Sequence, residues 1–269
     1  MAAATVSRPA TASAVVDLGD VRLAVWDTRG GADAVVLLHA AVGHGDTWSA
    51  QHRSFRDAGY RVVSWSRRGH RGSTTGDAAR PPSATHDLVR LLGRLGIERL
   101  HLVGTAYGAF HALDAALTLR DRLMSLTLSS SLCGITDESW TTTTARLLPP
   151  AWEMLPAEVR ELSPAYRAAH PDGVRRWLAA VDGNERRVEQ PTDHAATFAL
   201  LGTIRTPTLV VGGDADAYLP PPRLREIVAA VPRAHGIVIR EAGHNPAWEQ
   251  PAAWDAAVLT HLAETSRRL

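Results

Sequence analysis

The sequence predicts an α/β protein with a mostly parallel β-sheet that is covered by helices on both faces. Short apolar runs of strand length alternate along the chain with amphipathic stretches of helical length, a pattern typical of such sheets. The chain has 269 residues, of which 45% are hydrophobic, enough for one large domain with an insertion. One long segment without strand-like runs interrupts the alternation, and we expect it to form a helical insertion.

The first expected strand spans residues 21–26, where apolar and polar side chains alternate, so we expect an exposed antiparallel strand. The later strand-like runs are short and mostly apolar, as in the buried strands of a parallel sheet. These runs are residues 35–38, 61–65, 100–103, 126–128, 208–211 and 236–239. Residues 84–95 and 107–119 have the length and spacing of amphipathic helices that connect such strands.

Residues 134–204 carry several prolines and no convincing strand, so we expect short helices that form a cap inserted between two strands of the sheet. The expected core then consists of residues 14–133 and 205–269. Residues 1–13 are rich in Ala, Ser and Thr and are expected to form a flexible N-terminal tail. The aromatic residues of the cap either pack it onto the core or line a pocket, and both interpretations stay open.

Composition gives no reason to expect a nucleic-acid or membrane partner, because 29 basic and 28 acidic residues leave a net charge of +1. The N-terminal residues lack a continuous apolar region, and no later stretch resembles a membrane span, so we expect a cytoplasmic monomer or homodimer. The single Cys133 excludes an internal disulfide framework and a multi-cysteine metal site, and it is expected to be a small buried residue. No motif for a cofactor, metal or nucleotide is found.

The most informative motif is Gly-Thr-Ala-Tyr-Gly at residues 104–108. It stands between a strand-like run and a helical run, the setting of a G-x-S-x-G nucleophile elbow, with Ala106 where the serine should stand. Such a turn forces its central residue into a strained backbone conformation, while the flanking glycines let strand and helix approach closely. The sequence therefore predicts a nucleophile site whose presented side chain is a methyl group.

Four further motifs accompany the elbow, and with them the chain resembles the α/β-hydrolase superfamily over about residues 14–266. They are Leu37-Leu38-His39-Ala40, Ser66-Arg67-Arg68-Gly69-His70-Arg71-Gly72-Ser73, Val211-Gly212-Gly213-Asp214-Ala215-Asp216 and Ala242-Gly243-His244-Asn245-Pro246. Each motif alone is weak, but five in the family's order and spacing are specific. The resemblance implies an eight-stranded sheet and a serine-type hydrolase of small esters or lactones that needs no cofactor.

A hydrolase of this type needs a histidine base and an acid that orients it, in the chain order nucleophile, acid, histidine. In similar proteins the last aspartate of a Gly-x-x-Asp pattern faces the histidine, which maps here onto Gly213 and Asp216. The rival Asp214 is expected to hold the loop through backbone hydrogen bonds. His244 follows a glycine after the last strand, and an imidazole can accept and return a proton near neutral pH.

The resemblance also indicates an oxyanion hole, which needs two backbone N–H groups aimed at the developing negative oxygen. Tyr107 is the first expected donor, at a helix start where the helix dipole helps. Ala41 is the second, although the family's His-Gly is replaced here by His39-Ala40. His39 is expected to brace this loop.

The expected substrate is a small, fairly apolar molecule. Candidate contacts lie on the loop after His39 and in the cap; they are His44, Trp48, Trp140, Trp152, Tyr166 and Trp177. His44 is either a substrate contact or simply an exposed side chain.

Three explanations compete for Ala106. The first is a deliberate serine-to-alanine change in a working hydrolase, the second a natural enzyme in which His244 acts as a base without a covalent step, and the third a binding protein on a hydrolase scaffold. We favour the first, because Asp216, His244 and both elbow glycines are intact and alanine is the least disruptive replacement for serine.

Overall fold

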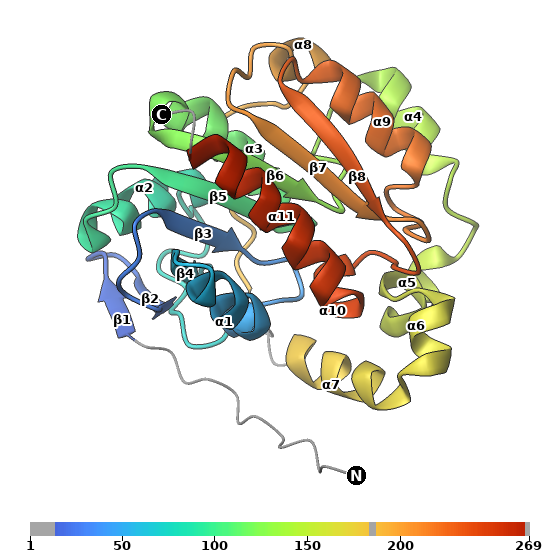
Figure 1. Ribbon diagram of the computed structural model, residues 1–269, viewed down its shortest axis with the longest axis horizontal. Helices are drawn as coiled ribbons and strands as arrows, with labels where there is room; N and C mark the ends of the chain where they lie inside the picture. Colours follow the sequence, from blue (N-terminus) through green and yellow to red (C-terminus); the bar gives the residue numbers. More distant parts are fainter. Residues whose placement is uncertain (1–13, 183–186, 267–269) are drawn as a thin grey trace.

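The computed structural model describes residues 14–182 and 187–266, so the expected tail at residues 1–13 lies outside the described part (Figure 1). Its eight strands form one sheet in the order β1-β2-β4-β3-β5-β6-β7-β8. The strands are β1 Ala14–Asp17, β2 Arg22–Asp27, β3 Ala34–Leu38, β4 Arg61–Trp65, β5 Leu100–Thr105, β6 Leu123–Ser129, β7 Thr208–Gly213 and β8 Ala234–Ile239. Pairs β1–β2 and β2–β4 are antiparallel, and the other five pairs are parallel. The predicted mostly parallel, eight-stranded sheet is confirmed.

One prediction about the strands is wrong in part. Strand β2 is antiparallel as expected, but it is not exposed, because it pairs with β1 on one side and β4 on the other. Leu23 and Val25 pack into the main core, while Ala24 and Trp26 are buried as well. The edge strand on this side of the sheet is β1, whose four residues were too few to give a clear signal in the sequence.

Helices cover both faces of the sheet, as predicted. Those of the core are α1 Ser49–Asp57, α2 Ala84–Leu95, α3 Tyr107–Leu119, α9 Pro221–Ala230, α10 Pro246–Glu249 and α11 Pro251–Ser266. Buried side chains of α2, α3 and α9 form one apolar cluster with one face of the sheet. Those of α1 and α11 form a second cluster with the opposite face, and α11 crosses the sheet in the view of Figure 1. Helices α2 and α3 match the predicted residues 84–95 and 107–119.

Residues 134–204, for which we keep the name cap, are helical in their described part, where no strand occurs. Ile135, Trp140, Ala196, Leu201 and Ile204 of this segment nevertheless pack into the main core. The elements of the cap are α4 Glu138–Ala145, the 3₁₀ turn η3 Trp152–Met154, α5 Ala157–Glu161, α6 Pro164–Ala169, α7 Pro171–Val181 and α8 Phe198–Leu201. Helices α5, α6 and α7 project from the core beside α10, whereas α4 and α8 lie near α9 (Figure 1). Leu162, Tyr166 and Trp177 give α6 and α7 a small apolar cluster, against which Trp248 of α10 packs.

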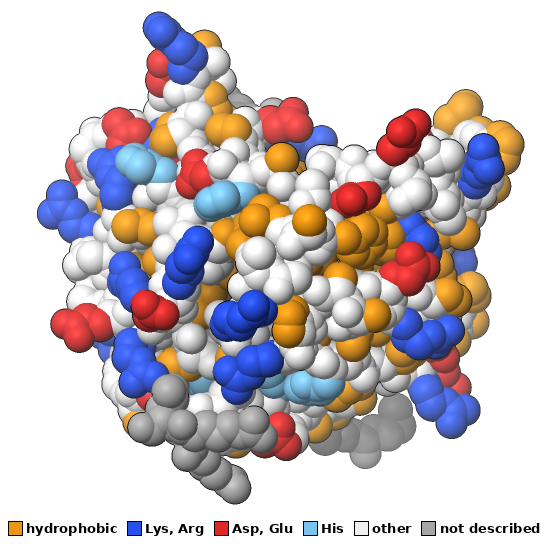
Figure 2. Space-filling view, turned by 90° about the horizontal axis from the view of Figure 1, so that it is seen from above, with side chains coloured by type: hydrophobic (Ala, Val, Ile, Leu, Met, Phe, Trp, Pro, Cys, Tyr) orange, Lys and Arg blue, Asp and Glu red, His pale blue; other side chains and the backbone are white. Residues whose placement is uncertain are grey.

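Acidic and basic side chains are interspersed over the face seen in Figure 2. This arrangement agrees with the near-zero net charge. No helix within residues 14–182 and 187–266 has the length and hydrophobicity of a membrane-spanning segment.

Candidate active site

The turn between β5 and α3 holds residue 106 in a strained backbone conformation. Ala106 has φ +49° and ψ −117°, in a region that residues other than glycine rarely adopt. A Cβ on Gly104 would lie 2.4 Å from the carbonyl oxygen of Gly108, and one on Gly108 would lie 2.2 Å from that of Leu38. Only glycine therefore lets β5, α3 and β3 approach this closely. Their contact fixes residue 106 at the carboxyl end of β5.

Asp216 and His244 lie in direct contact at the carboxyl edge of the sheet. Both carboxylate oxygens of Asp216 are 3.0 Å from Nδ1 of His244. The backbone N–H groups of Tyr218 and Leu219 also donate to Asp216 Oδ1. Asp214 is exposed instead, and its side chain accepts a hydrogen bond from the Ala242 N–H. The geometry thus favours Asp216 over Asp214 as the acid that orients the histidine.

The environment stabilises the charged forms of this pair. Burial alone would lower the pKa of His244, but the charge and hydrogen bond of Asp216, aided by Glu161 and Glu249, raise it above 6.5. Burial alone would raise the pKa of Asp216, but the charge and hydrogen bond of His244, with two backbone N–H donors, lower it. Because Nδ1 is held by Asp216, Nε2 is the ring nitrogen left for proton transfer.

Ala106 and His244 line the same cavity, which we call the reaction cavity. It has a volume of about 250 Å³ and is lined by Ala106, Tyr107, Phe110, Ser131, Leu132, Cys133, Gly134, Tyr218 and His244. Cys133 is fully buried, and burial raises its pKa to about 12, so it stays a thiol as a small buried residue would. The Tyr218 ring packs on His244 with a centroid separation of 4.6 Å.

The two expected oxyanion donors are Tyr107, within the elbow, and Ala41, in the loop after β3. Tyr107 is the first residue of α3, so its N–H has no acceptor within the helix. Ala41 lies in a turn closed by the hydrogen bond from the Gly43 N–H to the Ala40 carbonyl. His39 accepts the Arg67 N–H at Nε2 and donates from Nδ1 to the Ala40 carbonyl, so it braces this turn. The oxyanion roles stay predictions.

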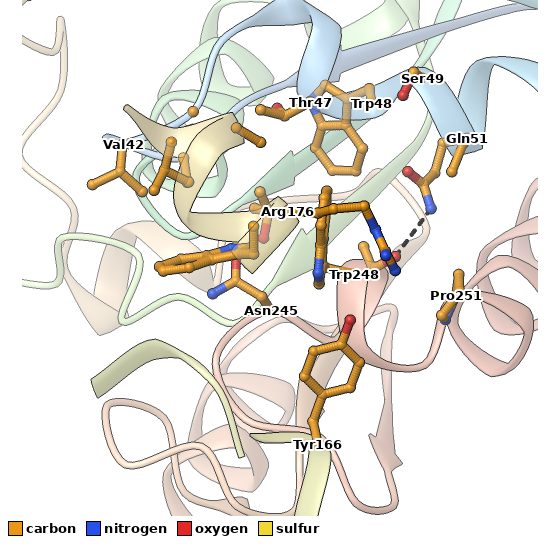
Figure 3. Close-up of a pocket in the computed structure, with 18 residues that line it drawn as sticks. Val42, Thr47, Trp48, Ser49, Gln51, Tyr166, Arg176, Asn245, Trp248 and Pro251 are labelled. Carbon is orange, nitrogen blue, oxygen red and sulfur yellow. Dashed lines mark hydrogen bonds between the residues drawn. The ribbon is translucent and has the colours of Figure 1, made fainter. Parts of the chain in front are cut away.

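A second cavity of about 260 Å³, which we call the tryptophan cavity, is drawn in Figure 3. Its lining includes Thr105 and Asn245, the chain neighbours of Ala106 and His244. Aromatic side chains dominate the rest; they are Trp48, Tyr166, Trp177 and Trp248. In Figure 3 Tyr166 points towards Trp248, and Trp48 lies across the cavity from Tyr166. Arg176 is the one charged side chain among these lining residues.

The structure separates the expected substrate contacts. Trp48, Tyr166 and Trp177 line the tryptophan cavity. Trp152 lines neither cavity, but its ring packs edge-on against Tyr218, which lines the reaction cavity.

His44 and Trp140 require correction, because neither lines a cavity beside the elbow. His44 lines neither of the two cavities and is not exposed: it is buried, and its Nε2 lies 2.9 Å from the Ala180 carbonyl of α7. Burial lowers its pKa to about 4, so the ring is neutral and ties the loop after β3 to the cap. Trp140 is buried in the main core, with the Arg223 guanidinium 3.7 Å from its ring centroid.

The sequence did not single out Trp248 and Glu249, which follow His244 by four and five residues. Both belong to α10, whose four residues are too few to show helical periodicity. Their nearness to His244 in the chain was the only available signal. The same holds for Tyr218, two residues after Asp216.

Taken together, the elbow, the Asp216–His244 pair and the two cavities at the carboxyl edge of the sheet define a hydrolase-type site on an open α/β sheet. The sequence model of the alpha/beta hydrolase family matches residues 35–257. The chain therefore belongs to the alpha/beta hydrolase family.

Named relatives agree with this assignment. A 2-hydroxy-6-oxononadienedioate/2-hydroxy-6-oxononatrienedioate hydrolase of Burkholderia vietnamiensis is 28% identical over 271 residues, covering 92% of this chain and 93% of the relative. Among solved structures, a thermophilic esterase from Thermogutta terrifontis has a TM-score of 0.72 at 24% identity, covering 91% of this chain and 94% of the other. The enol-lactonase of Burkholderia xenovorans LB400 has a TM-score of 0.74 at 20% identity, covering 93% of this chain and 100% of the other. These two structures support the fold.

We expect Asp216→Asn to lower the pKa of His244, because burial then acts without the opposing carboxylate charge. An NMR titration of the His244 imidazole measures this directly, and its midpoint should fall below that of the unsubstituted protein. Asp214→Asn is the matched control and should leave the midpoint unchanged, because Asp214 is exposed and bonds the Ala242 N–H instead. Equal shifts in both variants would contradict the assignment of Asp216.

Proposed function

We propose that the chain is built as a serine-type hydrolase of a small, largely apolar carboxylic ester or lactone, with Ala106 at the position of the nucleophile. One observation carries the proposal: residue 106 keeps the strained elbow conformation and lines the same cavity as His244, which is paired with Asp216. Backbone strain of this kind costs about 1–3 kcal/mol and is typical of functional sites.

With serine at position 106, His244 Nε2 would accept the hydroxyl proton while the oxygen attacks the carbonyl carbon of the substrate. The N–H groups of Tyr107 and Ala41 would stabilise the tetrahedral oxyanion. His244 would then pass its proton to the departing alkoxide, leaving an acyl ester on residue 106. Water, activated by the same histidine, would release the acid. With Ala106 no acyl ester can form, so the chain as given should bind substrate without this rapid turnover.

The two cavities support a substrate that extends to both sides of the elbow. Thr105 and Asn245 face the tryptophan cavity, while Ala106 and His244 face the reaction cavity. Four aromatic side chains favour an apolar and planar group in the tryptophan cavity. Arg176 favours an anionic group in this cavity. The named substrate of the Burkholderia vietnamiensis relative is a dioate, which agrees with an anionic end.

A second candidate is an enzyme without a covalent step, in which His244 removes a proton from the substrate. The observation that favours it is the fully formed Asp216–His244 pair beside a residue that cannot act as a nucleophile. A binding protein is the third possibility, and it would not need this pair.

We expect Ala106→Ser to hydrolyse short p-nitrophenyl esters far faster than the chain with Ala106. In the serine background, His244→Ala should lower kcat by several orders of magnitude, because members of a triad act as a unit. The rate should rise with pH and reach half its maximum above pH 6.5. The base must be neutral to act, and the pKa of His244 is raised above that value.

Two outcomes would contradict the proposal. One is a folded Ala106→Ser variant that hydrolyses no member of a panel of esters and lactones. The other is fast turnover by the chain with Ala106 that disappears in His244→Ala and does not improve with serine, which would establish the base-only candidate. Equal ligand affinity with and without His244, and no turnover in any variant, would support a binding protein.

The tryptophan cavity gives a further expectation for substrates. In the Ala106→Ser background, Arg176→Gln should raise KM for a carboxylate-bearing aryl ester about two- to fivefold and leave KM for its uncharged analogue unchanged, as for a solvent-exposed ion pair. Arg175→Gln is the matched control: Arg175 is exposed, pairs with Asp172 and does not line the cavity. Equal effects of the two substitutions would place the anionic group elsewhere.

A further inference from the structure

A buried carboxylate lies behind the loop that carries His244. Glu249 ends α10 and is only 4% exposed. Its Oε1 accepts hydrogen bonds from the Gly243 N–H at 2.9 Å and the Asn245 N–H at 3.2 Å. These are the residues on either side of His244. One carboxylate oxygen therefore fixes the backbone before and after the histidine.

The other oxygen of this carboxylate bonds to the cap. Glu249 Oε2 accepts the Ser163 N–H at 2.7 Å, just before α6. The cap also holds the histidine itself, because the His244 N–H donates to the Glu161 carbonyl at 2.9 Å. The backbone amides of residues 243, 244 and 245 thus all bond either to Glu249 or to the cap.

The cap and the histidine loop are also in close steric contact. A Cβ added to Gly243 would lie 2.6 Å from the Ser163 nitrogen, so this position has no room for a side chain. Ser163 Oγ donates to the Glu241 carbonyl and accepts the Tyr166 N–H, and the second of these bonds caps the N-terminus of α6. Tyr166 lines the tryptophan cavity. A continuous set of contacts therefore runs from that cavity through Ser163 and Glu249 to His244.

Burying a carboxylate is costly unless hydrogen bonds or a cation compensate it. Within the described residues Glu249 takes part in no salt bridge. The backbone N–H groups of Gly243, Asn245 and Ser163 offset its burial in part, but burial still raises the pKa of this carboxyl. These donors come from two segments more than 75 residues apart in the sequence. If the cap moved away, Glu249 would lose one donor in a buried site, so displacement of the cap is coupled to the histidine loop.

We propose that Glu249 is a positioning residue that holds His244 in place and joins its loop to the cap. The inference rests on the proposed role of His244 as the base of the site. Glu249 touches no reacting atom in this account. It acts through the backbone of residues 243 and 245 and through its negative charge near the imidazole.

The test uses the protein with Ala106 and needs no turnover. Glu249→Gln keeps the size of the side chain but removes its charge. It should lower the midpoint of the His244 NMR titration by about half a pH unit or more, and it should speed amide hydrogen exchange at Gly243, Asn245 and Ser163 at least about tenfold. Glu249→Asp keeps the negative charge but shortens the side chain. Amide hydrogen exchange should therefore rise, while the midpoint of the His244 titration should change less than in Glu249→Gln. Glu264→Gln, an exposed change of equal charge on α11, should alter neither.

A folded Glu249→Gln variant with unchanged His244 titration and unchanged exchange would overturn the proposal. Should the variants fail to fold, the unsubstituted protein still decides it. The amides of Gly243, Asn245 and Ser163 should open together with one free energy, because one carboxylate holds all three. Unrelated opening free energies would contradict the proposal. These readouts are independent of ester hydrolysis, so an inactive Ala106→Ser variant would refute the proposed function and leave this inference standing.

Discussion

The close approach of three backbone segments at Gly104 and Gly108 is the constraint on which the site depends. Strand β5, helix α3 and the end of β3 meet there without side chains between them. The contact leaves residue 106 no relaxed conformation, and its φ of +49° costs about 1–3 kcal/mol. Packing of α3 and β5 in the main core offsets this cost. The turn therefore persists with alanine, because its geometry is set by its neighbours and not by the side chain it presents.

The same edge of the sheet gathers the other groups from distant parts of the chain. Asp216 follows β7, His244 follows β8, and the carboxyl ends of these parallel strands bring their side chains to residue 106. Neither group is held by its pairing alone. Backbone N–H groups of residues 218 and 219 fix the aspartate, while Glu249 and the cap fix the histidine loop. The site is thus preorganised by hydrogen bonds within the protein.

The sequence predicts the helices, the strands and the elbow well, because their signals are local. The amphipathic spacing of α2 and the glycine pattern at residues 104–108 can be read within a few residues, whereas α3 has the predicted bounds but is buried on nearly all sides and is not amphipathic. Prediction from the sequence fails where tertiary contacts decide whether a residue is buried or exposed. Alternation at β2 indicated exposure, but a preceding short strand covers it. Trp140 and His44 were predicted to be substrate contacts. In the structure the Trp140 ring packs against the Arg223 guanidinium, and the His44 imidazole bonds to the Ala180 carbonyl. The role of Glu249 could not be predicted from the sequence, because its hydrogen-bond partners come from the histidine loop and from the cap.

The central claim is that residue 106 stands at the position of a nucleophile served by His244. The most direct measurement is the intact mass of the Ala106→Ser variant after exposure to an alkyl fluorophosphonate, followed by peptide mapping. The account predicts one phosphonyl adduct on residue 106 with loss of fluoride, strongly slowed by His244→Ala and absent from the chain with Ala106. A folded serine variant that stays unmodified, or an adduct that forms equally with Ala106 in place, would contradict the account.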